Sequence, residues 1–503
     1  MAILPEIVDD ASDPVSSVFM RRFCTMVLLV GVVACAEGPE RGNTILFASG
    51  ADLQSMNPLV TVHPLAKQVQ RYALLTTLVR YDAGLSPQPY LASSWQWSDD
   101  RRTLTFTLHA QLMWDDGTPT TATDVAWTLN AARDPRASYP RSSDLASVTK
   151  VEVGSDTTVT VTFDRPLPAV PDVFTDLAIL PAHHFREVRL ENLRQAPWNQ
   201  QPVGNGPFRF IAHEPNRRWV FQAKPDFPLA LGGPPAMDRF IVVVVDEPTT
   251  KLAALTAGEL DFAGISPAHA EFVRRDTRLE VVDYPLLFTY GMVFNTRRPP
   301  FDDPSIRRAI SLALDRREIV DGYLFGFGEP AWQAVPAGVP GRLPSSPGAH
   351  DPDSARALLG GRSVALELLT VGSGEAPLEQ MIQAQLTPVG FDVSIRQLEL
   401  GAFLDRVYSP THEFDVAVMG IPGDLALGFL RPLIELTGVE APFSPADAQE
   451  VLRAGDPVVF LYHARGVSGR NRRVRHVTMD LRGELPTLSQ WDASPMNNES
   501  NRE

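Results

Sequence analysis

Cysteine is scarce in this chain of 503 residues, which has two, Cys24 and Cys35. The sequence after Cys35 contains none, so no disulfide can form within that part of the chain. Hydrophobic residues make up 44% of the sequence, an ordinary share for a globular protein. A chain of this length can bury a core large enough to be stable without disulfides, and it has room for two or three domains.

An excess of positive charge is also missing. The net charge is −15, and residues 1–35 contribute only −2 of it, so the remainder is strongly acidic. This balance argues against binding to a phosphate backbone, and nucleic acids are therefore not expected as partners. Beyond residue 35, no apolar run approaches the length of a transmembrane helix.

Common enzyme signatures are absent. The sequence has no G-x-S-x-G, H-E-x-x-H or C-x-x-C motif and no Walker loop. We therefore expect no enzymatic activity, no cofactor and no metal site. His183 and His184 are adjacent, and in a strand their side chains would point to opposite faces. We interpret them as surface or loop histidines and not as ligands of a shared metal.

A secretory signal is indicated between Met20 and Cys35, where the sequence reads MRRFCTMVLLVGVVAC. Two arginines precede a short apolar run, and small residues precede Cys35. The ending resembles the bacterial lipobox, which implies a lipid attached to Cys35. Residues 1–19 are acidic, which is wrong for the cytoplasmic end of a signal, so we expect translation to start at Met20. An N-terminal membrane anchor or a short buried helix is the alternative.

The rest of the chain alternates between helical and strand patterns. Apolar residues recur at helical spacing in four segments, at residues 66–82, 121–134, 303–326 and 376–390. The second of these has Thr121 or Thr123 as its N-cap, and in the third Ile310 and Leu314 share one face and are expected to be buried. Strand-like segments at residues 363–371 and 391–399 flank the fourth helix, and a strand–helix–strand unit of this kind builds a partly parallel sheet. The sequence therefore predicts an α/β fold.

Several phrases then resemble one family by their order as well as their wording. Trp95, Ser98 and Asp100 precede a strand, which is followed by the D-G-T-P turn at residues 116–119 and by Asp124 at a helix start. Later phrases read QPVGNGPFRF, LTAGELDFA and VFNTRRPPFDDPSIRRAISLALDRREIV. This series resembles the family 5 extracellular solute-binding proteins of bacterial ABC importers, the peptide and nickel binders. The physical roles of Gly117, Pro119 and Asp124 are structural, in a turn and at a helix start.

The resemblance implies a two-lobed periplasmic binding protein, class II-like, with an extra subdomain in the first lobe, mixed sheets with flanking helices and a hinged cleft. Strands near residues 284–295 and 456–462 would cross between the lobes. The implied segments are a spacer at 36–43, a first lobe at 44–62, 180–287 and 456–490, an extra subdomain at 63–179, a second lobe at 288–455 and a disordered tail at 491–503.

The resemblance also implies a function. A monomeric, lipid-anchored protein in the periplasm or at the cell surface would capture short peptides or a related solute and deliver them to a membrane permease. Asp424 matches the family's aspartate that pairs with a peptide amino terminus, although the aromatic residue before it is missing here. Gly423 and Asn295 are further candidates for ligand binding. The alternative for Asp424 is an ordinary turn residue, and no matched histidine supports binding of nickel through a chelator.

The chain departs from the family in one place. Only about thirty residues separate Asp424 from the segment AGDPVVFLYH, roughly half of the family's usual length. The shortened part normally closes the second lobe and contributes to the cleft. A secreted interaction or sensor protein that keeps the fold without transport is therefore the alternative function.

Overall fold

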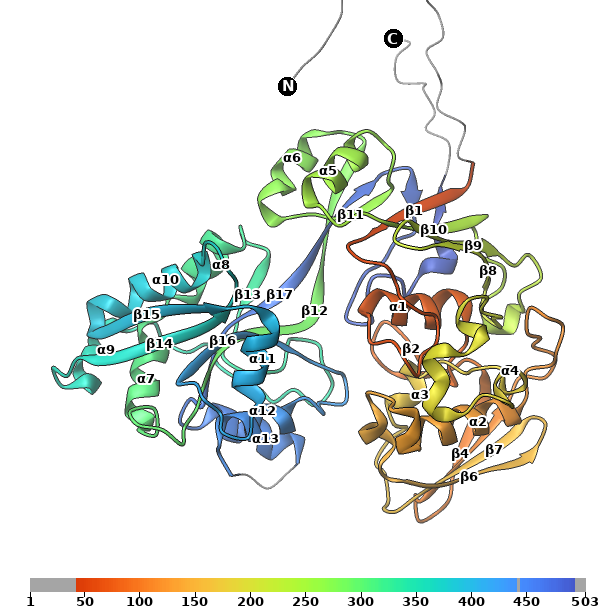
Figure 1. Ribbon diagram of the computed structural model, residues 1–503, viewed down its shortest axis with the longest axis horizontal. Coiled ribbons are helices and arrows are strands. Elements are labelled where there is room, and N and C mark those ends of the chain that lie inside the picture. The colour runs from red at the N-terminus through yellow and green to blue at the C-terminus, as the bar shows by residue number, and fades with distance from the viewer. Residues whose placement is uncertain (1–41, 441–443, 494–503) are drawn as a thin grey trace, which may run out of the picture. The chain divides into compact units, whose positions relative to one another are not determined.

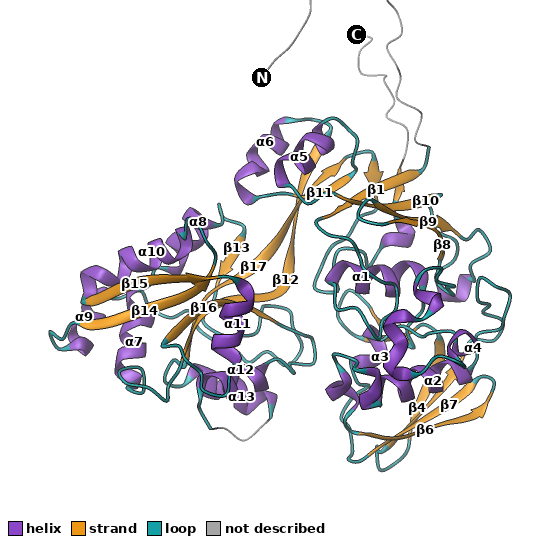
Figure 2. Cartoon of the chain, in the orientation of Figure 1, coloured by secondary structure: helices purple, strands orange, loops and turns teal. Residues whose placement is uncertain are grey.

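Two long strands, β12 (Leu279–Phe294) and β17 (Val458–Asn471), pair antiparallel and lie at the middle of an 11-stranded mixed sheet (Figures 1 and 2). This computed structural model describes residues 42–440 and 444–493. The proposed leader, the signal with Cys35, most of the spacer and residues 494–503 lie outside the described residues.

The large sheet continues on both sides of this central pair. From one edge to the other its strands are β15 (Phe391–Leu398), β14 (Val364–Val371), β16 (Val416–Pro422), β12, β17, β11 (Phe262–Gly264), β1 (Thr44–Ser49), β10 (Arg239–Val244), β9 (Arg218–Ala223) and β8 (Phe208–Glu214), and β13 (Gly328–Pro330) also pairs with β17. The strands β14 and β15 are parallel and are joined by helix α10 (Pro377–Leu386). The strand–helix–strand unit predicted from the sequence is therefore confirmed.

A separate four-stranded antiparallel sheet forms the core of the extra subdomain. Its order is β4 (Ala92–Trp97), β5 (Thr103–Leu108), β7 (Thr158–Phe163) and β6 (Val148–Ser155). Helix α2 (Ala122–Arg133) packs on this sheet. Thr121 is its N-cap, and Asp124 completes a capping box, accepting hydrogen bonds from Thr121 N, Trp114 Nε1 and Ala182 N. The structural role predicted for Asp124 is confirmed.

The remaining elements are short. Two-stranded ribbons pair β2 (Val79–Tyr81) with β3 (Pro87–Pro89) and β18 (Val474–Arg475) with β19 (Asp492–Ala493). The other helices are α1 (Pro64–Val69), α3 (Val173–Asp176), α4 (Ala182–Phe185), α5 (Pro248–Thr256), α6 (Ala270–Arg275), α7 (Pro304–Ala313), α8 (Arg316–Tyr323), α9 (Pro352–Leu359), α11 (Leu400–Tyr408), α12 (Leu430–Thr437) and α13 (Pro445–Arg453). Among the described residues, none of these helices has the length and apolar character needed to cross a membrane.

The buried apolar side chains form separate clusters in the two lobes, on either side of the central strands. The apolar core of the first lobe is continuous with that of the extra subdomain, so that Phe240 and Phe106 belong to one cluster. In the second lobe, alternate strand residues such as Met292 and Val293 enter two clusters on opposite faces of the sheet. Residues 458–462 of β17 also belong to these two clusters. The first lobe was expected to include residues 456–490, but residues 458–462 of β17 complete the second-lobe core instead.

The helix predicted over residues 303–326 is two helices. Helix α7 ends at Ala313, and Leu314 has the extended dihedral angles φ −90° and ψ 119°. Asp315 then caps α8 by accepting hydrogen bonds from Arg317 N and Glu318 N. The burial prediction is nevertheless confirmed, since Ile310 and Leu314 are 0% and 1% exposed.

The C-terminal segment is ordered further than the sequence indicates. Trp491 is fully buried, with its ring stacked 4.8 Å from the ring of Phe262, and Asp492–Ala493 pair with β18. The prediction of a disordered tail is therefore wrong for residues 491–493. The shortened segment after Asp424 forms α12 and α13, whose apolar faces include Leu433 and Leu452 and cover one face of the second-lobe sheet.

Candidate functional site

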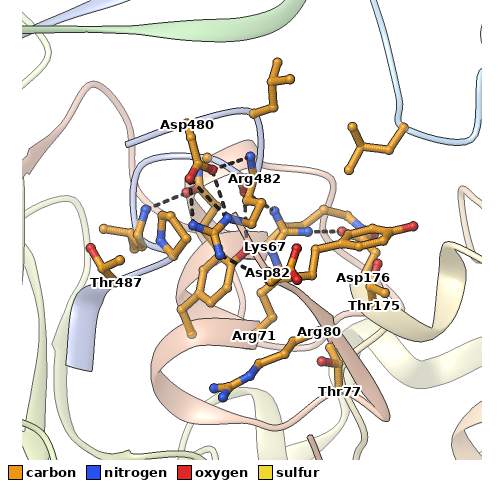
Figure 3. Close-up of a pocket in the computed structure, with 18 of the residues that line it drawn as sticks. Lys67, Arg71, Thr77, Arg80, Asp82, Thr175, Asp176, Asp480, Arg482 and Thr487 are labelled. Atoms are coloured by element: carbon orange, nitrogen blue, oxygen red, sulfur yellow. Dashed lines mark hydrogen bonds and ion pairs between the residues drawn. The ribbon is translucent and has the colours of Figure 1, made fainter. Parts of the chain in front are cut away.

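A cavity of about 910 Å³ lies between the two lobes (Figure 3). The first lobe supplies most of its lining, from α1, the β2–β3 ribbon, α3 and residues 478–490. The second-lobe side is smaller and consists of Leu287 on β12 and the turn Gly423–Leu425 after β16. The cavity is thus bounded by segments on both sides of the crossing strands.

A buried carboxylate organises the first-lobe wall. Asp176, at the end of α3, accepts hydrogen bonds from Lys67 at 3.0 Å, from Arg141 at 2.7 Å and from Arg71. Burial alone would raise the pKa of Asp176, but the three cations outweigh burial and hold it well below its usual value. One anion therefore fixes three long basic side chains in place, and Figure 3 labels two of them, Lys67 and Arg71, together with Asp176.

Two further carboxylates lie beside this cluster. Arg141 is 2.6 Å from Asp144 and 3.5 Å from Asp172. Burial raises the pKa of both carboxyl groups, and the negative charge of Asp424 on the second lobe adds to both increases. Asp144, Asp172 and Asp424 therefore form an acidic group, in which Asp172 and Asp424 line the cavity from opposite lobes and Asp144 lies outside the lining.

Arg80 is the basic side chain of the cavity that has no anionic partner among the described residues. It lies on β2, is exposed, and its guanidinium stands 5.0 Å from the ring centroid of Tyr90. Figure 3 draws it apart from the cluster around Asp176. By contrast, Arg482 is neutralised by Asp480 at 2.7 Å. An incoming anion would therefore find its free cation at Arg80.

Asp424 and Gly423 line the cavity. Gly423 N donates a hydrogen bond to Leu287 O at 2.7 Å, and a Cβ at this position would stand 3.3 Å from that oxygen, so little room remains for a side chain. The two carboxylate oxygens of Asp424 accept hydrogen bonds from Gly428 N at 3.0 Å and Phe429 N at 2.9 Å. Asp424 therefore orders the turn before α12, and each oxygen keeps a lone pair for another donor.

The expectation for Asn295 is not met. Its side chain is buried, and its amide donates to His412 O at 2.9 Å and to Phe414 O at 3.2 Å. It does not line the cavity. Asn295 follows β12 in the second lobe and fixes a neighbouring loop, so the resemblance misplaced it.

The prediction of no shared metal at the adjacent histidines assumed that they lie in a strand. His183 and His184 lie on the helical turn α4 and not in a strand, so their rings are not forced to opposite faces. Both rings reach Asp116 of the D-G-T-P turn, with Nε2–Oδ2 distances of 2.7 and 2.9 Å. These three residues lie outside the cavity lining.

Sequence reasoning missed Arg80 because it predicted one helix over residues 66–82. The helix α1 ends at Val69, a π-helical turn follows at Gln70–Leu74, and the chain is extended at β2. The glycines of the phrase VGNGPFRF explain this change. A Cβ on Gly204 would stand 2.2 Å from Leu74 O, and one on Gly206 would stand 2.5 Å from Ala73 O. The two glycines were a usable signal in the sequence, because glycine permits the close approach of another backbone segment.

Three relatives describe what this chain is similar to. A Pseudomonas aeruginosa protein named for di/tripeptide binding is 27% identical over 405 residues, which is 75% of each chain. The dipeptide-binding protein of Escherichia coli is 25% identical over 427 residues, covering 78% of this chain and 76% of that protein. The crystal structure of NikA from Brucella suis in complex with Fe(III)-EDTA has a TM-score of 0.77 at 20% identity, covering 90% of this chain and 100% of that one.

The crossing strands and the cavity between two lobes agree with the fold of these proteins. The family model described as bacterial extracellular solute-binding proteins, family 5 middle, matches residues 86–430. The match includes residues 86–179 of the extra subdomain, the central strand β12 and the turn that carries Asp424. The chain belongs to the bacterial extracellular solute-binding proteins of family 5.

Proposed function

We propose that this chain is the substrate-binding protein of an ABC importer and captures short peptides with free termini between its lobes. The observation that carries the proposal is the separation of charge in the cavity, with a free cation at Arg80 and the carboxylates of Asp172 and Asp424, beside which Asp144 lies outside the lining. The names of the Pseudomonas aeruginosa and Escherichia coli relatives support peptides as the ligand class. The protein binds and releases its ligand and performs no chemistry on it.

The peptide ammonium is assigned to the acidic group. Burial is the main cause of the raised pKa values of Asp144 and Asp172, and the negative charge of Asp424 raises both further, although Arg141 lies within 3.5 Å of the first two carboxylates. An ammonium bound there relieves the repulsion between these carboxylates and gains charge-assisted hydrogen bonds. Because Asp424 belongs to the second lobe and the other two to the first, this contact also favours closure.

The peptide carboxylate is assigned to Arg80. A guanidinium offers two parallel N–H donors to a carboxylate, and its stacking on Tyr90 restricts its orientation before ligand arrives. Between the termini, the extended backbone of the ligand meets main-chain groups of the Gly423 turn and the 478–490 segment. Peptide length is then set by the span between the two charged ends.

Closure uses the two central strands. The pairing of β12 with β17 is irregular between Pro285 and Thr289 and again between Tyr290 and Gly291, which divides the first-lobe half of the ladder from the second-lobe half. A break of this kind is where strands bend when lobes rotate. A ligand that contacts both lobes across the cavity shifts the population toward the closed form.

Calorimetry on three forms of one dipeptide tests the assignment. The free dipeptide should bind, whereas its N-acetylated and C-amidated forms should bind more weakly by about 2–5 kcal/mol each, the range for losing one partner of a charged interface contact. Asp424→Asn should reduce the penalty for acetylation only, and Arg80→Met the penalty for amidation only. A double-mutant cycle isolates each coupling. Asp353→Asn, 87% exposed on α9, is the control.

Three outcomes would overturn parts of this proposal. If no free dipeptide binds, native mass spectrometry of undenatured protein identifies any trapped solute by its mass, and a trapped compound that is not a peptide ends the peptide assignment. If Asp424→Asn binds the free and acetylated forms as the wild type does, Asp424 is only a turn residue. If the protein binds dipeptide in calorimetry but supports no uptake in a vesicle-reconstituted transport assay, the sensor function is favoured instead.

We propose a site of export and attachment together with this function. The protein acts in the periplasm or at the cell surface, as a monomer anchored through a lipid on Cys35, and hands its ligand to a permease. Cys35→Ser should abolish incorporation of labelled palmitate, and Cys24→Ser should not. A chain that starts at Met20 should be exported at least as well as the full sequence. Labelling that survives in Cys35→Ser, or export lost on deleting residues 1–19, contradicts these proposals.

A further inference from the structure

Three metal-ligating side chains meet outside the cavity. Asp116 lies in the D-G-T-P turn after β5, and His183 and His184 lie on α4. The Nε2 atoms of His183 and His184 are 2.7 and 2.9 Å from Asp116 Oδ2, and the three ligand atoms all lie within 4.8 Å of one another. None of the three residues lines the cavity assigned to peptides.

The turn holds Asp116 in place. Thr118 N donates to Asp116 Oδ1 at 2.9 Å, so Oδ2 is the oxygen that faces the imidazoles. Gly117 has a φ of +84°, which lets the turn close without strain. Thr118 O in turn accepts a hydrogen bond from Trp114 N at 2.8 Å. The carboxylate is therefore fixed by its own loop and does not depend on the histidines.

The histidine pair is fixed by other contacts. Ala182 N donates to Asp124 Oδ1 at 2.8 Å, which ties the start of α4 to α2. Phe185, at the end of α4, is buried and stacks 4.8 Å from the ring of Trp127. The ring of His183 also packs edge-on against Trp114, 6.5 Å away. Two separately anchored segments thus present three donor atoms to one point.

We propose that Asp116, His183 and His184 bind a zinc ion, with water completing the coordination. Neutral imidazole nitrogens and a carboxylate oxygen are donors that zinc takes at about 2.0–2.2 Å, commonly three from the protein and one from water. Two such donors at a tetrahedral angle lie about 3.3 Å apart, so the nitrogens would move from Oδ2 by a few tenths of an ångström. Side-chain exposures of 28%, 22% and 33% leave an entry path for the ion and its water.

The ion's chemical class follows from the donors. Magnesium and calcium take oxygen ligands almost exclusively, so two imidazoles disfavour both. Imidazole with carboxylate suits zinc and its divalent first-row neighbours. Bound zinc would join the turn before α2 to α4, a link separate from ligand capture. The competing explanation is a carboxylate oxygen that simply accepts two hydrogen bonds, and the two explanations differ in metal uptake.

Titration of the full, tag-free chain with zinc chloride after treatment with EDTA tests the site. We expect one high-affinity zinc per chain, a rise in thermal midpoint with zinc, and no such rise with magnesium. Cobalt should give the visible d–d absorption of a tetrahedral site. His183→Gln and His184→Gln should each weaken zinc binding at least about tenfold, since even the loss of an outer-shell partner commonly costs that much.

The matched control is His213→Gln. His213 also pairs with one carboxylate, Asp52 at 2.9 Å, but among the described residues this pair does not belong to a group of three candidate metal ligands, so its replacement should leave zinc affinity unchanged. If the double variant His183→Gln/His184→Gln binds as much zinc as the wild type, the cluster is only a hydrogen-bonded contact. The variants' thermal midpoints without metal show that they are folded. Peptide calorimetry on them should match the wild type, which keeps this test separate from that of the peptide cavity.

Discussion

The two walls of the cavity are built differently. On the first lobe, Asp176 and three cations form a buried network, and Arg482 pairs with Asp480. On the second lobe, the wall is mostly main chain and apolar side chains, with Asp424 as its one charged group among the described lining residues. A wall already satisfied by internal ion pairs keeps its shape without ligand. The difference indicates that the first lobe presents a preformed surface and that the second adds contacts when the lobes close.

Removal of the central anion should have the largest effect on the first-lobe wall. Asp176→Ala leaves Lys67 and Arg71 without the anion that each contacts, and the side chain of Asp176 is only 8% exposed. Arg141 keeps its contacts with Asp144 and Asp172. Breaking a buried ion pair on one side costs about 3–5 kcal/mol, which urea unfolding should detect. The control is Glu152→Ala, because Glu152 and Lys150 are 51% and 62% exposed and such a pair contributes about 1 kcal/mol or less. Equal losses in the two variants would remove the contrast between the lobes.

The second lobe should instead depend on apolar packing. Leu314 is 1% exposed and lies in the cluster of Ile310 and Met292. Leu314→Ala should lower the free energy of unfolding by about 2–5 kcal/mol, because it deletes buried methyl groups and leaves a cavity. Leu400→Ala, at a position 53% exposed on α11, is the control and should be nearly neutral. An unchanged thermal midpoint for Leu314→Ala would contradict the packing described for the break between α7 and α8.

Low pH should destabilise the folded protein through a histidine on the strands that join the lobes. His463, on β17, is 6% exposed, and its Nδ1 is 2.9 Å from Thr289 Oγ1 on β12. Burial, and then the charge of Arg342, lower the pKa of His463 to about 4. Between about pH 6.5 and 4 the unfolded chain therefore binds a proton that the folded chain does not, so the folded state loses stability as pH falls. The loss should approach about 3 kcal/mol at pH 4.

His463→Gln checks this pH dependence directly. The variant cannot take up a proton at this position, so its unfolding free energy should fall less steeply between pH 6.5 and 4 than that of the wild type. His476→Gln is the comparison, since His476 is exposed. Parallel stability curves for wild type and His463→Gln over this range would show that His463 is protonated in the folded protein.

The smallest stability effect is expected at Asp424. Without ligand, Asp424 still accepts hydrogen bonds from Gly428 N and Phe429 N. Asp424→Asn replaces one acceptor by a donor that faces an N–H group, so we expect a loss of about 0.5–2 kcal/mol, as for a helix cap. Hydrogen exchange of the two amides, compared between the variant and the wild type, locates the effect. If the two amides are equally protected from exchange in the variant and the wild type, packing and not the Asp424 side chain orders the turn.

Local patterns were sufficient for much of the fold. The capping box at Thr121 and Asp124, the hairpin of β6 and β7 and the parallel pair β14–β15 all follow from residues near one another in sequence. The apolar spacing predicted the wrong structure where a segment distant in sequence makes close backbone contacts. Apolar spacing continued through residues 66–82, but Gly204 and Gly206 pack against Leu74 and end the helix there. Leu314 likewise fits a helical face, yet an aspartate cap after it starts a new helix.

The sequence by itself determined the family and the turn that carries Asp424, because both are written in contiguous motifs. Only the tertiary structure decided the charges of the cavity and the meeting of His183 and His184 with Asp116. Lys67 and Asp176 are 109 positions apart, and His183 and Asp116 are 67 apart. An ion pair or a ligand set depends on separations of a few ångströms in space. Residues this far apart reach such separations only when the whole core packs, and no local pattern records that.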